Sequence, residues 1–246
     1  SGWLEPLCRV VFTVLWIYKV EGIMLFNSYI FIFLFFPLCL LGFYGIKQKN
    51  TALAKVWLTG FSLWFYGYFN ASYLLIMLFS IVFNYGVYLL MMKSGEDAPL
   101  WKNKKTIMIA GVGANILLLF YFKYYDFFLN TLNGVLGVFN LQLLDKPFDL
   151  LLPVGISFYT FQALGYIFDV YRGEIEPEKN LLRYALFVSF FPQLVAGPIE
   201  RSENLLKQMR ETETQKLYSY ENITNGLILM IWGLFVKMVI SDRVAI

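Results

Sequence analysis

Histidine is absent from the 246-residue chain, and cysteine occurs only twice, at Cys8 and Cys39. Without histidine the chain itself has no imidazole base, no histidine metal ligand and no Ser-His-Asp triad. Both cysteines lie inside apolar runs, which favours packing roles over a disulfide. We therefore expect no metal site and no bound cofactor in this chain.

Charge is also scarce, at 15% of residues where soluble domains have about 25%. Hydrophobic residues make up 59% of the chain, and the mean hydropathy is +0.60. These values predict an all-α, multi-pass membrane protein, with the lipid bilayer as its main partner. Twenty Lys and Arg nearly balance seventeen Asp and Glu, so no nucleic-acid partner is expected.

Apolar runs divide the chain into predicted membrane segments. Residues 1–23 are expected to be an upstream or added segment, with an interfacial helix as the alternative, and residues 24–246 to form the membrane domain. Asn27 and Ser28 can cap a first predicted span that ends near Ile46, and Pro37 is expected to kink it. Further apolar segments are predicted at 57–69, 73–92, 106–125 and 223–240, the first of them unusually short.

The lysines indicate which ends face the cytoplasm. They cluster at 47–55 and 93–105, and cytoplasmic loops carry an excess of Lys and Arg. Residues 127–144 are too polar to span, and Asn130, Asn133 and Asn140 share one helical face, so a helix flat on the outer surface is predicted. Leu205, Leu206 and Met209 recur at helical spacing, which predicts an amphipathic cytoplasmic helix resting on the membrane.

The stretch from Leu152 to Arg201 contains Pro and Gly where a plain span would have Leu and Ala. Pro153 is predicted to start a helix that spans inward to Val170. Gln162 and Asp169 share a face of that helix. Both either line a cavity or have separate packing roles. In the second case Gln162 hydrogen-bonds a neighbouring helix and Asp169 lies at the headgroup level.

Residues 184–199 form a second interrupted run, which contains Pro192 and Pro198 and is short for a span. Basic residues lie on both sides of it, so a re-entrant dip with both ends in the cytoplasm is predicted. A tilted, Pro-kinked span is the alternative. The expected fold is thus a polytopic helical protein with tilted, short and re-entrant helices.

Three blocks of this stretch resemble the membrane-bound O-acyltransferase family, in the branch that contains the alginate O-acetylation membrane subunit. They read LPVGISFYTFQ at 152–162, YIFDVYRG at 166–173 and FFPQLVAGPI at 190–199. The resemblance extends in family order over residues 24–246. It implies a helical membrane enzyme with a buried tunnel, a cytoplasmic thioester donor such as acetyl-CoA or an acyl carrier, and an extracytoplasmic polysaccharide as acceptor. A secreted or periplasmic acetylation partner is also implied.

The same resemblance implies candidate residues for the tunnel and for substrate contacts. They are Ser157, Tyr159, Gln162, Asp169, Gln193, Gly197, Pro198 and Arg201. Gly197 and Pro198 would shape the dip, and Arg201 would meet an anionic donor at the cytoplasmic mouth. The alternatives are that Gln193 caps broken backbone and that Arg201 binds only lipid phosphate. No catalytic residue is assigned, because the family's catalytic histidine would lie beyond Ile246. We therefore expect an inactive N-terminal portion of a longer enzyme, with a degenerate scaffold as the alternative.

A transporter or flippase subunit is the competing function, because broken helices also build transport sites. Transporters usually carry paired interruptions in two halves. Here the interruptions lie mainly in the second half of the chain, which favours the enzyme.

Overall fold

The computed structural model describes residues 26, 28–69, 71–95, 99, 103–138, 153, 155–194, 201–212 and 219–244. The described residues are almost entirely helical and include no strand, as the sequence predicts. The chain divides into two compact units, residues 1–69 with 214–246 and residues 70–213. The predicted boundary after residue 23 lies outside the described residues.

The first unit begins with a π-helical turn, η1 (Phe31–Phe35), that leads into α2 (Phe36–Lys47). The Ser28 hydroxyl accepts a hydrogen bond from the Phe31 amide at 3.2 Å, so the predicted cap is confirmed. Pro37 stands in the first turn of α2 and has no amide to donate. Just before Pro37 the helical hydrogen-bond pattern widens to the π-helical one, and the Phe36 amide donates to the Phe31 carbonyl five residues earlier.

Helix α3 (Thr51–Phe69) is 19 residues long, so the prediction of a short helix at 57–69 is wrong at its start. Asn50 explains the difference, because its side-chain oxygen accepts from the amides of Ala52 and Leu53 and begins the helix one turn and a half earlier. Cys39 is buried and free, which confirms its packing role, whereas Cys8 lies outside the described residues.

The remaining helices of the first unit are α10 (Tyr220–Phe235), the π-helical segment η3 (Val236–Ser241) and α11 (Asp242–Val244). Residues 220–241 are long and apolar enough to cross a membrane, which agrees with the predicted span at 223–240. Leu229 is 71% exposed and Ile231 is 63% exposed. Such apolar surface is stable only against lipid or another apolar partner.

The second unit contains α4 (Ala71–Lys93), α5 (Lys104–Val138), α6 (Ile156–Arg172), α7 (Leu181–Ser189), α8 (Phe191–Leu194) and α9 (Ser202–Glu211). Helix α6 is central, because it contacts each of the other five. Helices α4 and the first part of α5 are also apolar enough to span a membrane. The fold is thus that of an all-α membrane protein.

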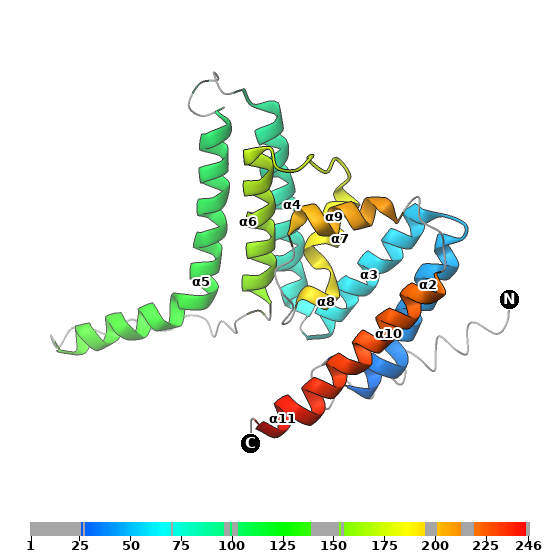
Figure 1. Cartoon of the computed structure of the whole chain (residues 1–246). Helices are drawn as coiled ribbons and strands as arrows, with labels where there is room; N and C mark the ends of the chain where they lie inside the picture. Colours follow the sequence, from blue (N-terminus) through cyan, green and yellow to red (C-terminus); the bar gives the residue numbers. More distant parts are fainter. Residues whose placement is uncertain are drawn as a thin grey trace. The chain divides into compact units, whose positions relative to one another are not determined.

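Helix α5 joins two segments that the sequence predicts separately, the span at 106–125 and the surface helix at 127–144. It is continuous over 35 residues, so the predicted separation is wrong. Figure 1 shows the last part of α5 turned away from the direction of its first part. The two directions are therefore achieved by bending one helix.

Helices α4 and α5 are joined by a pair of buried amides, Asn84 and Asn115. Each side-chain nitrogen donates to the other residue's side-chain oxygen, at 3.1 and 2.7 Å. Gly111 lies one turn away, and a Cβ placed there would come within 2.5 Å of Val87. Close approach and paired amides are the usual means of helix association in lipid.

The basic ends of three helices meet at one end of the second unit. The Lys104 ammonium, at the start of α5, donates to the Tyr171 carbonyl near the end of α6 at 3.0 Å. The Tyr85 hydroxyl of α4 donates to the Lys179 carbonyl at 2.7 Å. These contacts gather the loops that the charge rule assigns to the cytoplasm.

Two glycines with left-handed backbone bracket α6, Gly155 at φ 76° and Gly173 at φ 74°. Gly155→Ala is expected to destabilise the protein more than Gly173→Ala. Both substitutions incur the left-handed penalty of about 1–2 kcal/mol. Only at Gly155 would the new Cβ meet backbone, 2.4 Å from the Leu194 carbonyl oxygen, whereas nothing lies within 4 Å at Gly173. Thermal unfolding in detergent measures the difference, and equal losses would contradict the contact.

Candidate functional site

The start of α6 is defined by Gly155, which stands immediately before the helix in the left-handed conformation. Pro153 lies three residues before Ile156, so the prediction that Pro153 occupies the first helical position is wrong. The close approach of Gly155 to the Leu194 carbonyl holds the end of α8 against the start of α6.

Gln162 and Gln193 meet where α8 lies along α6. The Gln162 side-chain nitrogen donates to the Gln193 side-chain oxygen at 3.0 Å, and Gln162 is buried. Two of the predicted site residues, 31 positions apart, are therefore in direct contact. Helices α7 and α8 are separated at Phe190, which has non-helical backbone. This break agrees with the predicted interruption, and the predicted re-entrant geometry stays a prediction.

Helix α6 ends at Gly173, whose left-handed conformation reverses the chain. The Glu174 amide donates to the Asp169 carbonyl at 3.0 Å, and the Gly173 amide to the Val170 carbonyl at 3.3 Å. This is a glycine-terminated helix end that satisfies carbonyls otherwise left without partners. It directs the following loop, residues 174–180, back along the helix.

Glu178 is the buried carboxylate of that loop. It forms ion pairs with Arg183 of α7 at 3.4 Å and with Arg210 of α9 at 3.2 Å. Its amide donates to the Tyr166 hydroxyl of α6 at 2.7 Å, and its carbonyl accepts from the Tyr88 hydroxyl of α4. One residue therefore connects four helices.

Helix α9 covers this end of the unit. Leu205, Leu206 and Met209 are buried against the protein, so the prediction that this face rests on lipid is wrong. Helices α6 and α7 supply the apolar surface that the sequence assigned to the membrane. At the first residue of α9, the Ser202 hydroxyl donates to the Asp169 carboxylate.

A pocket of about 360 Å³ lies along α6 beneath the first turn of α9. Its lining includes Gln162, Tyr166, Asp169, Arg172, Arg201 and Ser202. The eleven residues from Gln162 to Arg172 correspond to about 15 Å of helix. The pocket is therefore long and polar, with an amide toward one end and Arg172 toward the other. Its charges are mixed, because the carboxylates of Asp169, Glu174 and Glu203 line it together with Arg172 and Arg201.

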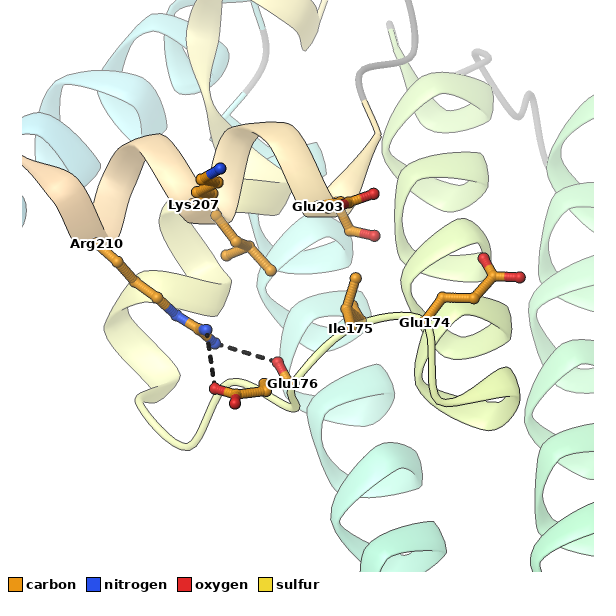
Figure 2. A pocket seen from close by; sticks show the side chains of 8 residues that line it. Glu174, Ile175, Glu176, Glu203, Lys207 and Arg210 are labelled. Carbon is orange, nitrogen blue, oxygen red and sulfur yellow. Dashed lines mark hydrogen bonds and ion pairs between the residues drawn. The ribbon is translucent and has the colours of Figure 1, made fainter.

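A second pocket, of about 200 Å³, continues along α9 and shares Glu174, Ile175, Ser202 and Glu203 with the first. Figure 2 shows Arg210 extending from α9 to the loop, where it contacts both the carboxylate and the backbone carbonyl of Glu176. The loop and α9 thus form one wall of both pockets. Among the described residues, no group of three or more Asp, Glu, Cys or His could hold a metal ion.

The structure brings together part of the predicted site. Gln162, Asp169 and Arg201 line the larger pocket, and Gln193 joins it through Gln162. Ser157 is half-buried and Tyr159 is buried on α6, and neither is among the residues that line the pocket. Gly197 and Pro198 lie outside the described residues. The roles of all these residues stay predictions.

Sequence reasoning missed Ser202, Glu178 and Arg210. Mixed charges such as those of α9 are typical of a solvated face, yet Arg210 pairs with a carboxylate that is only 3% exposed. No periodicity marks Glu178, because it lies in a loop. Ser202 is adjacent to a predicted residue, but a serine at the start of a helix predicts a cap rather than a bond to another helix.

The fold and the pocket define a helical membrane protein with a polar cavity at its basic end. No protein-family model and no solved structure matches the chain. Curated proteins do match it. The chain is 36% identical, over 91% of its length, to a peptidoglycan O-acetyltransferase of Helicobacter pylori, and it covers 45% of that protein.

It is 34% identical, over 90% of its length, to the "probable alginate O-acetylase AlgI" of Pseudomonas aeruginosa, of which it covers 41%. A teichoic acid D-alanyltransferase of Lacticaseibacillus rhamnosus is 26% identical over 59% of the chain. These relatives confirm the resemblance to the membrane-bound O-acyltransferase family, and the chain is homologous to its O-acetyltransferases. It spans less than half the length of these curated relatives.

Replacing Glu178 by Ala is expected to cost about 1.5–3 kcal/mol of stability, because Arg183 and the Asn180 amide lose the carboxylate, whereas Arg210 keeps Glu176. Arg210→Ala should cost less, since Glu178 keeps Arg183. Chemical unfolding in detergent measures both. Glu174→Ala is the control, because its exposed ion pair with Arg172 contributes about 1 kcal/mol or less. Equal effects at Glu174 and Glu178 would contradict the role of Glu178.

Proposed function

We propose that the full-length protein is an O-acetyltransferase of the inner or plasma membrane. It moves an acetyl group from a cytoplasmic thioester donor, acetyl-CoA or an acyl carrier, to a hydroxyl of an extracytoplasmic polysaccharide or of peptidoglycan. The observation that carries the proposal is the long polar pocket at the basic end of α6, in a chain homologous to O-acetyltransferases.

The reaction requires few groups. The acceptor oxygen attacks the thioester carbonyl, the new C–O bond forms, and the C–S bond breaks to release the donor thiol. The proton of the acceptor hydroxyl passes through a base to the leaving sulfur. The oxyanion that forms on the carbonyl needs hydrogen-bond donors, and water must be kept out because it competes as the acceptor.

The pocket fits the donor's part of that reaction. Arg172, which pairs with Glu174 at the surface, and Arg201 both line it. Their guanidinium groups can bind the phosphates of a donor. Gln162 lies about 15 Å along the helix from Arg172, with Gln193 bonded to it. Amide side chains can hydrogen-bond the amides of an extended thioester arm.

The base would be the histidine that the family resemblance implies, which these 246 residues do not contain. The chain alone is therefore proposed to bind donor without transferring acetyl. A secreted or periplasmic acetylation partner would receive or deliver the acyl group on the outer side.

Donor binding tests the role of the pocket. The chain in lipid vesicles is expected to bind acetyl-CoA, and Arg201→Ala to weaken binding about 3- to 10-fold, the effect of about 0.7–1.4 kcal/mol from one charged contact. Arg243→Ala is the matched control, since Arg243 is exposed at the end of α11 in the other unit. Calorimetry measures both, and equal affinities would contradict the role of Arg201.

Transfer tests the function. Membranes that contain the full-length protein are expected to move labelled acetyl from acetyl-CoA to polysaccharide or peptidoglycan, and the 246-residue chain to move none. Transfer by the isolated chain would overturn its proposed inactivity. Movement of a solute or lipid across the vesicle without acetylation would instead support the transporter, and neither activity in the full-length protein would support a scaffold.

A further inference from the structure

Helix α9 is attached at both ends by polar contacts and in its middle by apolar ones. Ser202, at its first residue, bonds the Asp169 carboxylate. Arg210, in its last turn, contacts Glu176 and Glu178. Ser202 and Arg210 are about 12 Å apart along the helix axis. Ten residues of helix move as a rigid element, so the two ends are mechanically linked.

The two ends are attached unequally. Arg210 makes three contacts, at 3.2 Å to the Glu178 carboxylate, 3.5 Å to the Glu176 carboxylate and 3.1 Å to the Glu176 carbonyl. Ser202 contributes a single side-chain bond among the described residues. When that bond breaks, Asp169 still faces the pocket, where water can solvate it. The Ser202 end is therefore the easier end to release.

The releasable end lies over the larger pocket. Arg201, Ser202 and Glu203 all line it, together with Gln162, which is only 6% exposed. Moving the first turn of α9 away from α6 would widen access to Gln162. The buried side chains of Leu206 and Met209 keep the rest of the helix on the protein, so the motion is a swing rather than a detachment.

We propose that α9 is a gate on the pocket, with the Arg210 contacts as its hinge and the Ser202–Asp169 bond as its latch. The closed state is the one described. The latch opens to admit a ligand along α6 and recloses to exclude water. That the ligand is an acyl donor rests on the proposed function, whereas the gate itself rests on these contacts alone.

Thiol labelling tests the gate in the 246-residue chain in lipid vesicles. Gln162→Cys places a reporter in the pocket, in a background with Cys8→Ser and Cys39→Ala. Ser202→Ala is expected to raise the rate of N-ethylmaleimide labelling at position 162 by about tenfold or more, since one hydrogen bond to a charged group is lost. Asp169→Ala should give the same rise, and the double variant no further rise, because both residues form one latch.

Two controls separate a gate from general loosening. Ser94→Ala removes a serine hydroxyl that bonds only its own helix, and it should leave the labelling rate unchanged. Ala163→Cys places a thiol on α6 at a fully buried position outside the pocket, and Ser202→Ala should leave it protected. No rise at position 162, additive rises in the double variant, or equal rises at 162 and 163 would each overturn the gate. Labelling requires no acetyl transfer, so failure of the proposed function would leave this result standing.

Discussion

Glu178 is a carboxylate that is removed from solvent at the point where four helices of the second unit meet. A buried charge is tolerated only with partners, and it has them in Arg183, Arg210 and the Asn180 amide. Its backbone is used as well, through the hydroxyls of Tyr88 and Tyr166. The loop, the start of α7 and the position of α9 all follow from satisfying this one residue. The two pockets lie between α9, which these contacts hold in place, and α6 with its following loop.

Elsewhere in the chain, the membrane allows apolar side chains to stay exposed on the protein surface. Apolar side chains of α5 and α10 are left exposed, as for Leu117 at 69%, because lipid covers them at no cost. Polar groups within the helices must instead find partners inside the protein. Asn84 with Asn115, and Gln162 with Gln193, meet that requirement by pairing with each other. The Gln162–Gln193 pair differs from the Asn84–Asn115 pair because Gln162 lines a pocket, which makes it a candidate for binding a ligand.

Charge and cavity coincide in the second unit. Arg172 at the pocket and the lysine that joins α5 to α6 lie at the same end. The carboxylates of Asp169, Glu174 and Glu203 line the pocket as well, so a ligand there would meet groups of both charges and an amide further along the helix. The wall that separates the pocket from solvent is α9, held by a network of ion pairs at one end and by a single bond at the other. In the proposed acyl transfer, access for the ligand and exclusion of water would both depend on this one short helix.

The sequence alone determined the helical membrane class, because low charge together with long apolar runs is typical of membrane-spanning helices and not of soluble domains. It also indicated Gln162 and Asp169, because polar residues on one face of an apolar helix are conspicuous, whereas Gln193 and Arg201 came with the family resemblance. The prediction that the apolar face of α9 rests on lipid was wrong, because an apolar helical face can pack on lipid or on protein and the sequence does not distinguish the two. It separated α5 into two helices, because a bend leaves no composition signal. Only the tertiary structure decided that Gln162 meets Gln193 and that Glu178 joins four helices. Those pairings connect residues far apart in the chain, and no local pattern encodes which distant partner a buried polar group finds.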